Sequence, residues 1–250
     1  MAATDRFTLA SLAERPDLAT ELWSLTHLWP TFLLHDPTAD LYYERCERLF
    51  ADLVFVVEDP DEPGAVQARG FAVPFAMRGD ELPDAGWDEV IRWGIQDATD
   101  DRPATHVSAL EIVIRSEHRG SGLADRLIGA MRAAARARGV EQLVAPVRPT
   151  NKHRFPDEDM AGYAARVRAD GLPEDPWLRT HVRVGGEIVR VAPRSMTVSG
   201  SLAEWREWTG EPFDRPGPTI VGRALVPVIA DLDRDLAVYV EPNVWVVHDV

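Results

Sequence analysis

The chain contains a single cysteine, Cys46, and no apolar run that approaches the ~20 residues needed by a membrane-spanning helix. A lone cysteine excludes an intramolecular disulfide. The N-terminus also lacks the basic segment and apolar core of a secretory signal. We therefore expect a cytoplasmic protein with no membrane partner. Cys46 lies in the polar stretch YYERCERLF, and we interpret it as a buried or neutral thiol rather than a nucleophile.

Positive charge is scarce over the chain as a whole. The net charge is -14, from 27 Lys and Arg against 41 Asp and Glu, which argues against a nucleic-acid-binding protein. The segment 115–154 is the exception, because it contains nine basic residues and three acidic ones. A basic segment in an acidic protein suggests a local anionic ligand, although a solvated helix face is the alternative interpretation.

Apolar periodicity gives the coarse organisation of the chain. It predicts helices over 17–28, 40–51, 86–97, 122–138 and 158–169, and strands over 53–59, 68–77, 106–115 and 142–147. Beyond residue 181 strands dominate, in the stretches EIVRVA, SMTVSG, ALVPVIA and LAVYVEPNVWVVH. Strands and helices alternate first and strands prevail later, so we expect one α/β domain with a mixed sheet.

The stretch IRSEHRGSGLADRL, residues 114–127, joins a strand to a helix through a turn with two glycines. The first amides of a helix have no internal partner and the helix dipole is positive there, so such a terminus binds phosphate. Gly120 and Gly122 would admit a bulky anion without a Cβ in the way, and the Arg119 guanidinium can fork onto phosphate oxygens. The stretch therefore predicts a pyrophosphate site, with an ordinary strand–turn–helix joint as the alternative.

Two common phosphate-binding motifs are missing, since the sequence has neither a P-loop GK[ST] nor the dinucleotide fingerprint. Instead R-G-S-G-L-A, residues 119–124, resembles the [R/Q]-x-x-G-x-[G/A] signature of the GNAT acyltransferase superfamily. The resemblance includes the preceding strand, Glu117, the following helix and the strand QLVAPV, and it is specific over about 106–151.

The resemblance implies a single GNAT-like domain over 1–250, with a central mixed, mostly antiparallel sheet flanked by helices. The coenzyme A-binding core would span about 50–150, and the acceptor side and a strand-rich C-terminal extension about 151–250. It implies acetyl transfer from acetyl-CoA to a small-molecule amine by direct attack. A non-catalytic acyl-CoA-binding sensor and a transferase that uses another thioester donor are the alternatives. We expect no metal and no nucleic-acid partner, and leave a homodimer open.

The same resemblance assigns roles to individual residues. Coenzyme A would contact Ile112, Val113, Ile114, Arg119, Gly120, Ser121, Gly122, Leu123, Ala124 and Asn151. The amide of Val113 or Ile114 would stabilise the developing oxyanion, and Glu111 would accept the proton of the amine. Tyr163 would serve as the acid for the departing thiolate, although the insertion KHRFPDEDMAG disturbs its usual spacing from Asn151.

Overall fold

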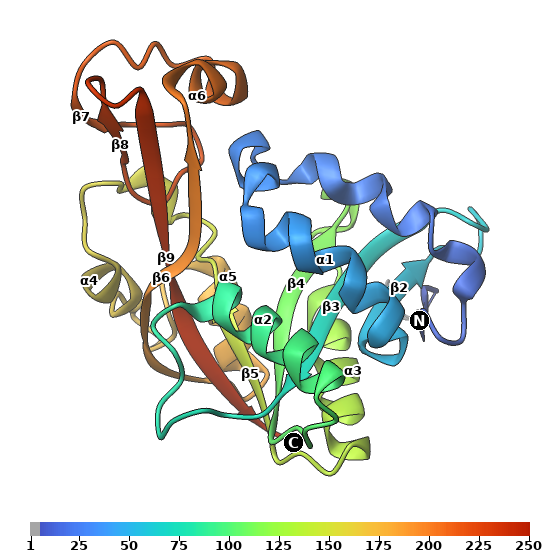
Figure 1. The fold of residues 1–250 in the computed structure, drawn as a ribbon. Helices are drawn as coiled ribbons and strands as arrows, with labels where there is room; N and C mark the ends of the chain where they lie inside the picture. The colour runs from blue at the N-terminus through green and yellow to red at the C-terminus, as the bar shows by residue number, and fades with distance from the viewer. Residues whose placement is uncertain (1–5) are drawn as a thin grey trace.

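The computed structural model describes residues 6–250 as a nine-stranded sheet covered by helices (Figure 1). The strands are β1 (Thr8–Ser11), β2 (Val54–Glu58), β3 (Val66–Phe75), β4 (His106–Ile114), β5 (Gln142–Val147), β6 (Glu187–Gly200), β7 (Gly217–Thr219), β8 (Val228–Asp231) and β9 (Leu236–Asp249). Their order is β1-β2-β3-β4-β5-β9-β8-β7, and β6 also pairs with β9. Among these pairs β4 and β5 run parallel and the others antiparallel. The predicted α/β class with a mixed, mostly antiparallel sheet is confirmed.

The α-helices lie on both faces of this sheet. They are α1 (Pro37–Leu49), α2 (Gly86–Thr99), α3 (Leu123–Ala137), α4 (Met160–Ala164), α5 (Pro176–Arg183) and α6 (Leu202–Thr209). A Cβ on Gly70 of β3 would meet Met131 and Leu127 of α3, whereas the neighbouring Phe71 packs against Tyr43 of α1. Because successive strand residues point to opposite faces, α3 covers one face and α1 the other.

Several predicted elements differ from the structure. The predicted helix 17–28 is two 3₁₀ segments, η1 (Pro16–Leu18) and η2 (Glu21–Leu28); Leu22 and Leu25 are buried at a spacing of three, which suits a 3₁₀ helix. The predicted helix 158–169 is limited to α4, because the chain turns back at the bridge between Val167 and Pro173. The stretches EIVRVA and SMTVSG form one strand, β6, with two shifts of register against β9.

The C-terminal region builds a second hydrophobic cluster. β9 pairs with β5 through its C-terminal half and with β8 through its N-terminal end. Around that end Trp205 of α6, Tyr239 of β9 and Phe32 of the 3₁₀ segment η3 (Thr31–His35) are buried together. In Figure 1 this part projects to the upper left, away from α2 and α3. The strand-rich C-terminus is thereby confirmed, and its core includes Phe32 and Leu33 from η3 in the N-terminal part of the chain.

Within residues 6–250, no helix is both long enough and apolar enough to span a membrane.

Two buried histidines join α5 to β9. His181 and His248 are 3% and 0% exposed, and Nδ1 of His181 lies 2.9 Å from Nε2 of His248. Burial lowers the pKa of His181 to about 3 and that of His248 to about 4, with further lowering by His248 on the first and by Arg132 on the second. Both rings are therefore neutral in the folded protein at neutral pH.

This pair predicts a loss of stability in acid. The folded pKa values lie below the ordinary value near 6.5, so the unfolded chain binds more protons between about pH 6.5 and 4, and stability falls as the pH is lowered. From pH 6.5 to 5 we expect each histidine to remove on the order of 2 kcal/mol from the free energy of unfolding.

The measurement is urea unfolding across pH for the wild type and for the double variant His181→Gln, His248→Gln. The difference between the two curves isolates the histidines. This comparison is needed because another group titrates over the same range. Burial beside Asp36 raises the pKa of Asp88 to about 9, so the contribution of Asp88 to stability rises as the pH is lowered. The stability difference between the two proteins should shrink as the pH falls, and a difference independent of pH would contradict the prediction.

Candidate functional site

The parallel ladder between β4 and β5 is short. It contains the pairs Val107–Leu143 and Ser108–Val144. Beyond them β4 stays paired with β3 as far as Ile114, while β5 stays paired with β9 as far as Val147. Within residues 6–250, the C-terminal end of β4 therefore pairs with β3 alone and that of β5 with β9 alone. The edges of β4 and β5 that face each other separate at this point.

A β-bulge marks the start of this separation. Phe71 of β3 pairs with Glu111 and Ala72 with Ala109, so Leu110 is the extra residue on β4. The carbonyl of Leu110 accepts a hydrogen bond from the Trp87 indole of α2, at 3.0 Å. A bulge bends its strand and increases its twist. Here the Leu110 carbonyl is bonded by the Trp87 indole instead of by a neighbouring strand.

The backbone amides of β4 alternate in direction. The amide of Arg115 donates to the carbonyl of Gln67 on the β3 side. Because amides alternate along a strand in an antiparallel ladder, those of Val113 and Glu111 also point to β3. The amides of Ile112 and Ile114 point to the other edge, from which β5 has diverged. Of the two predicted oxyanion donors, the geometry favours Ile114 over Val113.

The loop after β4 carries unsatisfied donors. Gly120 and Gly122 adopt φ of +78° and +87°, and Gly122 is the N-cap of α3, so no side chain in the described structure caps this helix. The hydroxyl of Ser121 is buried without a hydrogen-bond partner among residues 6–250. Uncapped helix amides together with an orphaned hydroxyl fit an anionic ligand that would accept their hydrogen bonds.

The loop is held from both sides. Before it, Arg115 donates to the carbonyl of Val66 at 2.9 Å, and the His118 ring lies 3.2 Å from the Gln67 amide oxygen. After it, Leu123 is fully buried, whereas Ala124 is half-buried. The Arg119 side chain is exposed. The loop backbone is thus held by polar contacts with β3 before it and by the buried Leu123 after it. The Arg119 side chain extends from this loop into solvent.

Glu111 lies on the sheet face opposite α3, in a buried ion pair. Arg69 of β3 donates from Nε to Oε1 at 2.5 Å and from Nη2 to Oε2 at 3.2 Å, and the two side chains are 1% and 4% exposed. The Trp29 indole, just after η2, donates to the same carboxylate at 2.6 Å. The role of Glu111 as a base stays a prediction, and the structure adds two donors that fix its orientation.

Aromatic rings surround this ion pair. The Arg69 guanidinium lies 5.2 Å from the Trp23 ring and 5.7 Å from the Phe71 ring. Burial and the negative charge of Glu111 raise the pKa of Tyr43 well above its ordinary value, so its hydroxyl stays protonated. Sequence reasoning missed this setting, although an arginine within the apolar strand ARGFAVPFAM was an available signal.

The structure joins Asn151 to Tyr163 through Asp175, despite the insertion between them. The Tyr163 hydroxyl donates to Oδ2 of Asp175 at 2.8 Å, and the backbone amide of Asn151 donates to the same oxygen at 2.8 Å. Oδ1 of Asp175 caps α5 through the amides of Trp177 and Leu178. Burial and Asp175 raise the pKa of Tyr163. Tyr163 as the acid stays a prediction, and the contact with Asp175 gives it a structural role as well.

Cys46 is unsuited to nucleophilic chemistry. Cys46 is 0% exposed, and burial raises the pKa of its thiol to about 12, which confirms the buried, neutral thiol expected from the sequence. In the part of the chain that the structure describes, no three His, Cys, Asp or Glu side chains are grouped so that they could hold a metal ion.

Known proteins resemble this chain over nearly its whole length. Arginine N-acetyltransferase avaD of Aspergillus versicolor is 35% identical over 273 residues, which cover 98% of this chain and 94% of the relative. Among solved structures, the loading GNATL domain of CurA from Lyngbya majuscula superposes with a TM-score of 0.58 at 18% identity, covering 97% of each chain. The GNAT-like decarboxylase GphF, solved with isobutyryl-CoA, gives 0.55 at 18% identity, covering 98% of each chain.

A scan against models of known protein families finds no match. The relative of 35% identity nevertheless covers nearly the whole chain, including the loop and the C-terminal region, and the two solved structures share its fold. A relative of this identity and coverage shows the family: the chain is an acyltransferase, and it belongs to the GNAT superfamily of N-acetyltransferases.

Proposed function

We propose that this protein transfers an acetyl group from acetyl-CoA to a primary amine, by direct attack of the amine within a ternary complex. The observation that carries the proposal is the uncapped N-terminus of α3, with the buried Ser121 hydroxyl beside it, at the end of a strand that has lost its parallel neighbour. The superfamily relationship supports the same donor, because the signature R-G-S-G-L-A coincides with this helix start.

The coenzyme would lie along β4 and end at the loop. The amides from Gly120 to Ala124 and the Ser121 hydroxyl would hold the pyrophosphate, with Arg119 as an added cation. Ile112, Val113 and Ile114 would flank the pantetheine arm, and Asn151 would approach it from the end of β5. When bound, acetyl-CoA supplies an activated acyl thioester.

The protein's own groups would supply alignment, charge stabilisation and proton removal. The Ile114 amide points to the open edge of β4 and would donate to the developing oxyanion, a contribution of roughly 3 kcal/mol for a preorganised donor. Glu111, oriented by Arg69 and Trp29, would take the proton of the amine. Tyr163 would supply a proton to the departing thiolate.

Direct attack, rather than an acyl-enzyme on a thiol, is supported by Cys46. It is the only cysteine of the chain, it is fully buried, and the pKa of its thiol is raised to about 12. The thiolate is the nucleophilic form of cysteine, so this side chain has neither the access nor the ionisation that a covalent step requires.

For the acceptor we infer arginine or a related amino acid. The relative avaD is named as an arginine N-acetyltransferase, and a net charge of -14 attracts a cationic acceptor. A cytoplasmic location and a homodimer stay predictions.

Gly122→Val should weaken coenzyme A binding at least 10-fold, because a branched side chain would strain the φ of +87° and occupy the space above the α3 amides. Isothermal titration of coenzyme A measures the effect. Gly139→Val is the matched control: Gly139 has φ of +72° at the other end of α3, so it should lose stability but keep its affinity. Equal affinity of wild type and Gly122→Val would contradict the loop assignment.

Initial rates should distinguish direct attack from a covalent intermediate. With acetyl-CoA and L-arginine as varied substrates, a ternary complex predicts intersecting lines in double-reciprocal plots of free-thiol release. Cys46→Ala should keep kcat within about twofold, since the thiol takes no part. Parallel lines, or loss of turnover in a folded Cys46→Ala protein, would argue for an acyl-enzyme.

Glu111→Gln should lower kcat by roughly 10²-fold at neutral pH and leave coenzyme A affinity within a few-fold, as expected for loss of a general base. The loss should shrink at high pH, where more of the acceptor amine is already neutral. The rate is measured against pH for both forms.

The control for Glu111→Gln separates loss of the base from loss of stability. It is needed because removing one partner of a buried ion pair costs about 3–5 kcal/mol of folding stability. The double variant Glu111→Gln, Arg69→Met removes both charges and should regain much of that stability, measured by urea unfolding, without regaining turnover. Near-normal turnover of Glu111→Gln at pH 7 would show that another group or water takes the proton.

A further inference from the structure

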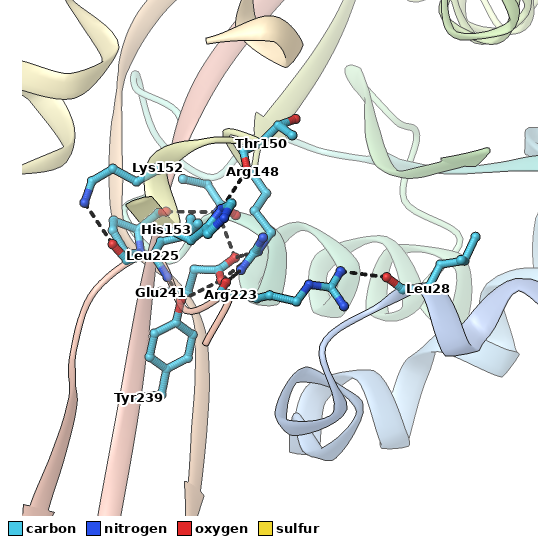
Figure 2. Close-up of polar contacts among 11 residues, drawn as sticks. Leu28, Arg148, Thr150, Lys152, His153, Arg223, Leu225, Tyr239 and Glu241 are labelled. Carbon is cyan, nitrogen blue, oxygen red and sulfur yellow. Dashed lines mark hydrogen bonds and ion pairs between the residues drawn. The ribbon is translucent and has the colours of Figure 1, made fainter. Parts of the chain in front are cut away.

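A polar cluster that the mechanism above does not use lies where β5 ends (Figure 2). Arg148, the residue after β5, donates from Nε to both carboxylate oxygens of Glu241 on β9, at 3.1 and 2.9 Å. Glu241 is 0% exposed and also accepts from the Tyr239 hydroxyl at 2.7 Å and from the Asn243 amide at 3.1 Å. The charge of this carboxylate is therefore already matched by Arg148 and two neutral donors.

Arg148 also holds a second arginine. Its Nη2 donates to the backbone carbonyl of Arg223 at 2.6 Å, and Nη2 of Arg223 donates in turn to the carbonyl of Leu28 at 2.7 Å (Figure 2). Arg223 has φ of +69°, a region that non-glycine residues other than Asn and Asp seldom adopt. Such strain persists where surrounding contacts impose it, and it concentrates at functional sites.

Positive charge exceeds negative charge around Arg223. Burial lowers the pKa of Arg223, and the charges of Arg148 and Arg119 lower it further. No carboxylate within residues 6–250 forms a salt bridge with Arg223, and its residue is exposed. The local excess of positive charge, on a guanidinium with unused donors, fits an anion from solution.

The position of Arg223 indicates which anion its guanidinium would bind. Its guanidinium is fixed on Leu28, and the next residue, Trp29, donates to Glu111. Glu111 and Arg69 lie on the sheet face opposite α3, since Gly70 between Arg69 and Phe71 faces α3. Arg223 is therefore connected to the proposed base through the adjacent residues Leu28 and Trp29.

We propose that Arg223 binds the carboxylate of the acceptor, so that the substrates are amino acids with a free carboxylate. The inference rests on the proposed N-acetyl transfer and assigns the residue that recognises the acceptor's carboxylate. Arg148 acts as a positioning residue, because it donates to the backbone carbonyl of Arg223 and is itself held by Glu241. The phosphates of coenzyme A offer the same anionic chemistry, and the experiment separates the two sources.

The experiment compares L-arginine with L-argininamide, which keeps the amine and the guanidinium but lacks the carboxylate. Thiol release gives kcat/KM for both acceptors, and KM for acetyl-CoA, in the wild type, in Arg223→Gln and in Arg215→Gln. Arg215 is an exposed arginine of the same C-terminal region and is the matched control. Thermal unfolding verifies that each variant is folded, and Arg223→Lys serves as the second variant because it keeps the charge.

We expect the wild type to favour arginine over argininamide at least 10-fold in kcat/KM. Arg223→Gln should lose at least 10-fold with arginine and stay within threefold with argininamide, with KM for acetyl-CoA unchanged; Arg223→Lys should lose less, and Arg215→Gln nothing. Equal losses with both acceptors, or no wild-type preference, would overturn the inference. A rise confined to KM for acetyl-CoA would assign Arg223 to the coenzyme phosphates instead. No thiol release with any acceptor would contradict the proposed function itself, and the inference with it.

Discussion

The early end of the β4–β5 ladder is the constraint on which the rest of the site depends. After Ser108 and Val144 each strand keeps only its outer partner, β3 or β9. The bulge at Leu110, whose carbonyl is taken up by the Trp87 indole, turns β4 at this point. The amides of Ile112 and Ile114 are thereby freed from a neighbouring strand, and the following loop brings the uncapped α3 N-terminus to the end of the same edge.

Two arginines, the buried Arg69 and the exposed Arg223, connect distant parts of the chain. Arg69 bonds both Glu111 and the carbonyl of Leu22 in η2, and Arg223 joins the C-terminal region to Leu28 at the end of that segment. A buried ion pair contributes little net stability once desolvation is counted, yet losing one partner is costly. The hydrogen bonds of Arg69 and Arg223 therefore join the N-terminal 3₁₀ segment to the central strands and to the C-terminal region.

The sequence predicted those helices and strands whose apolar residues repeat regularly or whose ends are marked by turn residues such as glycine. The strand before R-G-S-G-L-A, the helix after it and QLVAPV match β4, α3 and β5 closely. The 3₁₀ nature of 17–28 was missed because leucines three residues apart suit both helix types. The partners of Glu111 could not be predicted, since Trp29 and Arg69 are 82 and 42 residues away in the sequence. Asp175, which unites Asn151 with Tyr163, also lies beyond any local motif.

Hydrogen exchange on the backbone tests the central claim most directly, because it observes the amides to which the binding role is assigned. Without ligand, the uncapped amides of residues 122–125 should exchange fast; with saturating coenzyme A they should become strongly protected, together with Ile112 and Ile114. Peptides from α1 and α5 should change little. Protection that leaves residues 122–125 unchanged and falls elsewhere would contradict the account.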